Sequence, residues 1–103
     1  MVTITKKMAG QWLADVLQDK VFWCYDGRTL KNLAELQAAF EEMSEDSFRY
    51  HSNDVKSDFS SWVKDVIGDE KLAADLKQSQ TLAQAAQAVS RRVASLKRKA
   101  GTT

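Results

Sequence analysis

The one histidine of this 103-residue chain, His51, is the residue best suited to acid–base chemistry, because an imidazole titrates near neutral pH. Asp54 and Asp58 follow it closely, and a carboxylate can orient or charge the ring. Cys24, the one cysteine, would supply the nucleophile of a Cys–His pair. Catalysis would require these groups to converge in a pocket, and their spacing does not indicate that they do. We therefore predict no catalytic residue and no enzyme, with His51 as a structural hydrogen-bonding residue and Cys24 as a small buried hydrophobe.

A metal site is not predicted either. One cysteine and one histidine leave a zinc site two ligands short unless carboxylates complete it. Glu41, Glu42, Glu45 and Asp46 form an acidic cluster at a predicted helix junction, but they lack the regular spacing of a calcium-binding loop. We interpret this cluster as a solvated acidic surface and expect no cofactor.

A short aromatic segment is the first candidate for a contact surface. Trp23 and Tyr25 lie two residues apart in a predicted strand, so they point to one side and their neighbours to the other. One of these two sides is expected to be exposed, and Trp23 and Tyr25 are the candidate contact pair. Arg28 and Lys31 follow the predicted turn and are candidates for binding an anion or an acidic partner. The predicted partner contact comprises Trp23, Tyr25, Arg28 and Lys31.

The distribution of charge gives the second candidate. Residues 1–78 carry ten basic and fourteen acidic residues, whereas residues 79–103 carry five basic residues and no acid. Such a basic helix is typical of a surface that binds nucleic acid or an acidic partner. With nucleic acid, it would contact phosphates without reading the base sequence. Cations near a helix C-terminus also complement its dipole, and the acidic remainder of the chain could itself receive this helix. The predicted nucleic-acid contacts are Arg91, Arg92, Lys97, Arg98 and Lys99.

The elements that must position these residues are mostly helical. The chain contains no proline and four glycines, so little forbids long helices. Apolar residues recur at three- and four-residue steps from Thr5 to about Asp19, which predicts the first helix. Asp26-Gly27 is typical of a two-residue hairpin turn with positive φ angles, and it predicts a small hairpin at about residues 21–31.

Capping residues outline the later helices. Asn32 with Glu35 predicts a helix over about 33–43, and Ser44 predicts a short helix after it. Further helices are predicted from Asn53 to Gly68, after Asp69, and from Thr81 to about Arg98. The predicted fold is therefore a compact, mostly α bundle of five or six helices with one small β-hairpin after the first helix.

Length and composition predict a single domain over residues 1–103, with residues 100–103 frayed. No apolar stretch has the length of a membrane span or the character of a signal peptide, and the lone cysteine fits a reducing compartment. We expect a cytoplasmic protein without membrane contact. The apolar line of the last helix also suggests pairing with a second copy, although it is too short for a stable isolated coiled coil, so we expect a monomer or weak homodimer. That line comprises Leu82, Ala85, Val89, Val93 and Leu96.

Three motifs occur along residues 22–76. An aromatic strand precedes D-G-R-x-L-K-N-L-x-E-L, and then come M-x-x-x-x-F-x-Y-H-x-N and D-F-x-x-W-V-x-D-V-x-G-D-x-x-L-A. Together they resemble a small domain family of unknown function seen mainly in archaea and some bacteria. The resemblance implies no activity. At Ser57 the family pattern has Asn before the Asp-Phe pair, and both ends of the chain lie outside the resemblance. We predict a small non-enzymatic protein-interaction module with an unknown protein partner, and sequence-nonspecific nucleic-acid binding through the last helix as the alternative.

Overall fold

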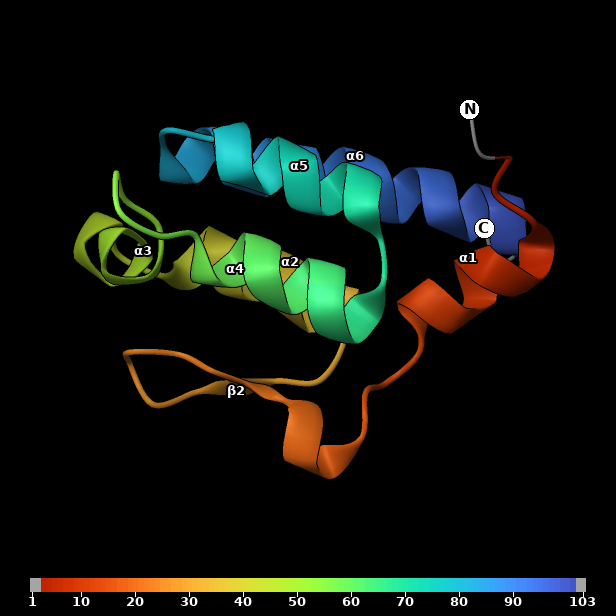
Figure 1. Ribbon diagram of the computed structural model, residues 1–103, viewed down its shortest axis with the longest axis horizontal. Coiled ribbons are helices and arrows are strands. Elements are labelled where there is room, and N and C mark those ends of the chain that lie inside the picture. The colour runs from red at the N-terminus through yellow and green to blue at the C-terminus, as the bar shows by residue number, and fades with distance from the viewer. Residues whose placement is uncertain (1–2, 102–103) are drawn as a thin grey trace.

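A computed structural model describes residues 3–101, which form six α-helices and a two-stranded antiparallel hairpin (Figure 1). The helices are α1 (Lys6–Leu13), α2 (Leu33–Glu42), α3 (Glu45–His51), α4 (Asp58–Trp62), α5 (Glu70–Gln78) and α6 (Leu82–Ala100). The strands are β1 (Phe22–Trp23) and β2 (Thr29–Leu30). The predicted fold class, a mostly helical bundle with a small hairpin after the first helix, is confirmed.

Side-chain caps begin five of the six helices where the sequence predicts them. Thr5, Asn32, Ser44, Asp69 and Thr81 each accept a hydrogen bond from the backbone N–H three residues later. Two side chains three residues after their caps also reach back, but to the residue before the cap: Lys31 N–H donates to Glu35 Oε1, and Gln80 N–H donates to Gln84 Oε1. Each of these caps satisfies backbone donors that a helix end would otherwise leave unpaired.

The first helix is shorter than predicted. It ends at Leu13 instead of continuing to about Asp19, because the chain becomes extended at Ala14. The backbone N–H of Val16 then donates to the carbonyl of Lys31 at 2.7 Å. This bond to a distant segment replaces the helical bond that continuation would supply, and only a short 3₁₀ turn (Gln18–Lys20) precedes β1.

The predicted helix from Asn53 to Gly68 is also shorter and has two parts. Asn53 does not open it: its Oδ1 accepts from the N–H groups of Val55 and Lys56, which folds residues 53–56 into a turn. Val55, which lies in this turn, is therefore 93% exposed. The helix begins at Asp58 and widens into a π-helical turn (Val63–Ile67). Gly68 ends it where the sequence predicts, as a left-handed cap at φ 98°.

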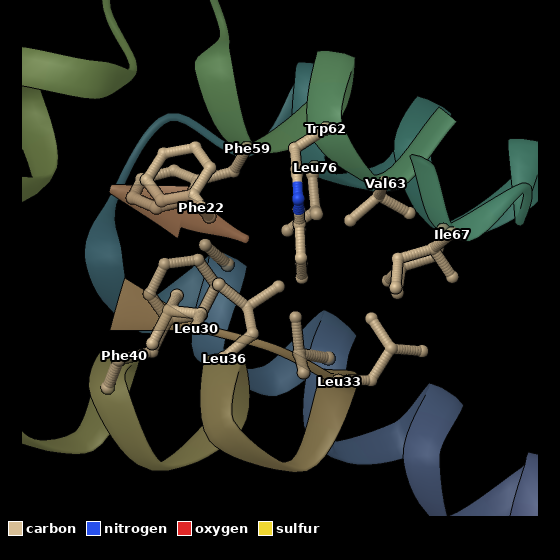
Figure 2. Close-up of a cluster of buried hydrophobic side chains, with 14 of the residues drawn as sticks. Phe22, Leu30, Leu33, Leu36, Phe40, Phe59, Trp62, Val63, Ile67 and Leu76 are labelled. Carbon is tan, nitrogen blue, oxygen red and sulfur yellow. The ribbon is translucent and has the colours of Figure 1, made fainter. Parts of the chain in front are cut away.

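The core lies between three layers of chain. In Figure 1, α5 and α6 lie together on one side of α2 and α4, and the hairpin lies on the other. Figure 2 shows side chains from the hairpin, α2 and α4 pointing toward one another in this core. Phe59 has the most aromatic neighbours, with ring centroids at 4.9 Å from Phe22 and Phe40 and at 5.9 Å from Phe48.

The long helix α6 closes the core. Four of the five residues of its apolar line are buried by the chain itself, with Ala85, Val89, Val93 and Leu96 each at most 3% exposed, and Leu82 is partly buried against the core, so the line does not form a free face for a second copy. The helix extends to Ala100 and is capped by Gly101, two residues further than predicted. Of the four residues predicted to fray, 102 and 103 lie outside the described residues.

Candidate functional site

Three exposed aromatic side chains lie on the hairpin and on α3. Trp23, Tyr25 and Tyr50 are 71%, 64% and 52% exposed, and we call them the aromatic surface. The Tyr25 and Tyr50 rings are in contact, with centroids 4.4 Å apart and planes inclined by 31°. Lys56 Nζ lies 4.7 Å from the Tyr50 ring centroid, within range of a cation–π interaction. The two segments that carry these rings are 25 residues apart in sequence and adjacent in the fold.

The hairpin turn determines which side of the strand is exposed. Phe22 pairs with Leu30 and Trp23 with Thr29, so Phe22 and Cys24 enter the core while Trp23 and Tyr25 remain outside. The predicted two-residue turn is wrong. Gly27 has a positive φ of 96°, no non-glycine residue among 3–101 does, and three residues (25–27) connect Cys24 to Arg28.

The side chain of Asp26 explains this turn. Its Oδ1 accepts the backbone N–H of Arg28 at 3.1 Å, and its Oδ2 lies 3.0 Å from Arg28 Nε. The Asp26 carboxylate makes both contacts while the backbone of Asp26 keeps an ordinary negative φ. Gly27 is therefore the one residue of this turn that needs a positive φ. Arg28, one of the predicted partner contacts, is therefore partly buried and paired with Asp26.

His51 connects the hairpin to the helices beneath it. The backbone N–H of Tyr25 donates to His51 Nε2 at 2.8 Å, and Nδ1 lies 3.0 Å from Asp58 Oδ2. Because a backbone N–H can only donate, Nε2 must be the unprotonated nitrogen and Nδ1 must carry the proton that Asp58 accepts. The ring is 5% exposed and packs edge-on against Phe22, Phe59 and Tyr50.

This arrangement decides what His51 can do chemically. A His–Asp pair has the geometry of a general base and its orienting group, but the base nitrogen would have to face a substrate. Here Nε2 faces the Tyr25 amide and the ring is inside the core. The geometry favours the predicted structural role, in which His51 holds the hairpin that carries Trp23 and Tyr25 against α3.

Cys24 has the surroundings of an unreactive thiol. It is 8% exposed, and burial raises its pKa from the ordinary value of 9.0 to about 11, with a further increase from Asp26 and a partial decrease from Arg28. The thiolate, which is the nucleophilic form, is therefore scarce at neutral pH. Within residues 3–101, no three histidine, cysteine or acidic side chains are grouped closely enough to hold a metal ion.

We expect Cys24 to react with a thiol reagent at pH 8 at least about 100-fold more slowly in the folded protein than in guanidinium chloride. The pKa of the Cys24 thiol is higher in the folded protein than in the unfolded protein. Its contribution to the free energy of unfolding is therefore complete below pH 9 and is lost as the pH rises toward 11. Wild-type protein should therefore lose on the order of 2 kcal/mol more unfolding free energy than Cys24→Ala over that interval. A native reaction rate within tenfold of the unfolded rate would show that the thiol is accessible.

The remaining predicted partner contact is Lys31. It is exposed, and its Nζ lies 4.0 Å from Asp15 Oδ2. Sequence reasoning did not identify Tyr50 as a contact residue; it lies in the short helix that Ser44 caps. In α3, Phe48 is buried and Tyr50 is exposed, as expected for residues two positions apart on a helix. The acidic cluster at the junction of α2 and α3 is exposed, as predicted; its members are Glu41, Glu42, Glu45 and Asp46.

The predicted nucleic-acid contacts divide into two groups. Arg92 turns inward: its Nε and Nη2 donate to Oδ2 and Oδ1 of Asp69 at 2.7 and 2.8 Å, and its guanidinium carbon lies 5.7 Å from the Trp12 ring centroid. Asp69 is fully buried, so Arg92 is a structural residue and not a surface contact. The other four predicted contacts are exposed on α6; they are Arg91, Lys97, Arg98 and Lys99.

Comparison of the chain with protein-family models, with curated proteins and with solved structures returned no match in any of the three. Within residues 3–101, no helix combines the length and the apolar character that crossing a membrane requires. At Ser57, where the family pattern noted above has Asn, the hydroxyl oxygen is buried and has no hydrogen-bond partner among residues 3–101.

Proposed function

We propose that this chain is a small, non-enzymatic protein-interaction module that binds a partner protein through the aromatic surface. The observation that carries this proposal is that Trp23, Tyr25 and Tyr50 are each more than half exposed and lie on adjoining segments. Trp and Tyr are enriched among the residues that dominate binding energy at interfaces. They bury a large area while losing the freedom of few side-chain bonds, which makes them effective anchors.

The surroundings of the aromatic surface support binding with little rearrangement. His51 fixes the Tyr25 backbone, and the Tyr25 ring already rests on Tyr50 in the free protein. Groups that are ordered before binding lose less entropy when the partner arrives, which favours affinity. The surface therefore resembles a pre-formed contact and not a loop that must fold.

The charges beside the aromatic surface favour a protein partner over a polyanion. Arg28 is paired with Asp26, and Lys56 Nζ lies 3.1 Å from Asp58 Oδ2. These pairs leave little net positive charge beside the rings, and a partner with an apolar or mixed surface suits them best. All three rings and His51 fall within residues 22–76, so under this proposal the interaction belongs to the unit that resembles the family of unknown function. A cytoplasmic module with a reduced, buried Cys24 completes the proposal.

The test is site-specific photocrosslinking in cells that naturally produce the protein. A photoreactive phenylalanine analogue placed at Tyr25 should give a discrete adduct, whereas the same analogue at Lys71 on α5 should not. The crosslinked protein is then identified and purified, and its affinity for the module is measured. Trp23→Ser should weaken binding by about tenfold or more, because it removes the most exposed of the three aromatic side chains.

Leu17→Ser is the matched control, because Leu17 is an apolar residue as exposed as Trp23, at 73%, outside the aromatic surface. It should leave the affinity unchanged. No adduct at Tyr25, or equal affinities for the Trp23 and Leu17 variants, would reject the proposed function.

A further inference from the structure

From the packing of the two terminal helices, we infer a second binding surface, which takes the phosphate backbone of double-stranded DNA without reading its sequence. It comprises Lys6 and Lys7 of α1 with Arg91, Arg98 and Lys99 of α6, and we call it the basic end. This inference goes beyond the proposed function and concerns a different surface.

The fold brings together two segments that carry no acidic residue. Asp15 is the first acid of the chain and Asp75 the last, so α1 and α6 contain basic residues alone among their charged positions. The two helices pack against each other, and α1 lies beside the last turns of α6 (Figure 1). The side chain of Lys6 reaches Gly101, where an added Cβ would lie 3.8 Å from Lys6 Cε. Five cations from opposite ends of the sequence thus lie on two helices that pack together, with Lys6 beside the last turn of α6.

These cations are available to a ligand. All five residues are exposed, and none forms an ion pair with a carboxylate of residues 3–101. The basic end does not include Arg92, which forms an ion pair with Asp69, or Lys97, which has an interaction within the protein. Arg91 and Arg98 are seven residues apart, so they lie on the same side of α6 about 10 Å apart along its axis. Residues 15–75 carry seven basic and fourteen acidic residues, so the opposite charge lies in the middle of the sequence.

The features of the basic end favour one class of anionic partner over the others. Helices that bind membranes bury an apolar face in the lipid, but the apolar face of α6 is already in the core. Proteins that bind single strands stack bases on aromatic rings, and the exposed rings among residues 3–101 all belong to the aromatic surface. Charge without an apolar face and without stacking rings suits a duplex, whose bases are inside and whose phosphates lie outside at about one charge per 1.7 Å.

The test is fluorescence polarisation of a labelled 20-base-pair duplex of mixed sequence between 25 and 200 mM NaCl. Three to five phosphate contacts should make log K fall by about 3 to 4.5 units per unit of log salt. Lys6→Gln/Lys7→Gln and Arg91→Gln/Arg98→Gln should each weaken binding about tenfold or more and reduce this slope by about 1 to 2 units. The Lys6/Lys7 variant is decisive, because these residues join the surface only if α1 and α6 act together.

Arg49→Gln/Lys77→Gln is the matched control: it removes the same two charges from exposed positions on α3 and α5, which lie away from α1 (Figure 1). This control should bind as wild type does, and so should Trp23→Ser, which separates this inference from the proposed function. Four results would overturn the inference: no binding at 25 mM NaCl, equal weakening in the Arg49/Lys77 control, tighter binding of a single strand of the same length, or equal binding of vesicles rich in phosphatidylserine.

Discussion

Arg92→Met is expected to lower the free energy of unfolding by about 3–5 kcal/mol, the usual cost of breaking a buried ion pair by removing one partner. Asp69 is fully buried and receives both guanidinium hydrogen bonds as well as the N–H of Leu72 that it caps. Without Arg92, its negative charge would remain in the interior with one backbone donor as compensation. Urea unfolding followed by circular dichroism measures the change.

The adjacent residue is the control. Arg91→Met changes the same side chain at an exposed position and should shift stability by no more than about 0.5 kcal/mol. Asp69→Asn combined with Arg92→Met should cost less than Arg92→Met alone, because Asn still caps α5 and no buried charge is left. If Arg92→Met and Arg91→Met destabilise equally, the Asp69–Arg92 pair does not stabilise the fold.

Arg92 also shows where sequence reasoning fails. Along the sequence it is one of five cations in an acid-free helix, indistinguishable from Arg91. Its role depends on Asp69, which is 23 residues earlier and whose local signal is that of a helix cap. The inward position of Arg92 is consistent with its spacing from Val89 and Leu96, three and four residues away. A basic residue on the buried stripe of a helix is thus the signal that could have identified it.

The helices themselves were largely predictable, because their signals are local. Thr5, Asn32, Ser44, Asp69 and Thr81 cap helices where they were expected, since a cap needs a polar side chain and a backbone N–H three residues later. The errors lie where a local signal had a competitor. Asn53 resembles a helix cap in sequence, but its side chain closes a turn instead, and the helix begins five residues later.

The candidate surfaces were predicted only in part, for the same reason. Alternation along the strand separated Trp23 and Tyr25 from the core side chains, and the exposed pair is the one proposed. Tyr50 joins them through packing of α3 on the hairpin, and Lys6 joins the cations of α6 through packing of α1. Contacts between residues 25 or more positions apart depend on the packed core, which no short sequence window contains.

His51→Ala is expected to destabilise the protein by about 3 kcal/mol or more, because it removes a buried ring and leaves the Tyr25 amide without its acceptor. His51→Phe separates the two effects: it keeps an aromatic ring of similar size and should cost about 1–3 kcal/mol, the penalty for an unpaired buried donor. Both variants should also weaken the contact between the Tyr25 and Tyr50 rings, which nuclear Overhauser effects report.

Arg49→Ala is the control on the same helix, because Arg49 is exposed and its replacement should change stability by no more than about 0.5 kcal/mol. Hydrogen exchange tests the bond itself. The Tyr25 amide should be protected from exchange in the wild type, even though the next residue, Asp26, is exposed in the turn. It should exchange faster in His51→Phe, which lacks the acceptor. A Tyr25 amide that exchanges equally fast in both proteins would mean that His51 does not hold the hairpin, and that the aromatic surface is not pre-formed.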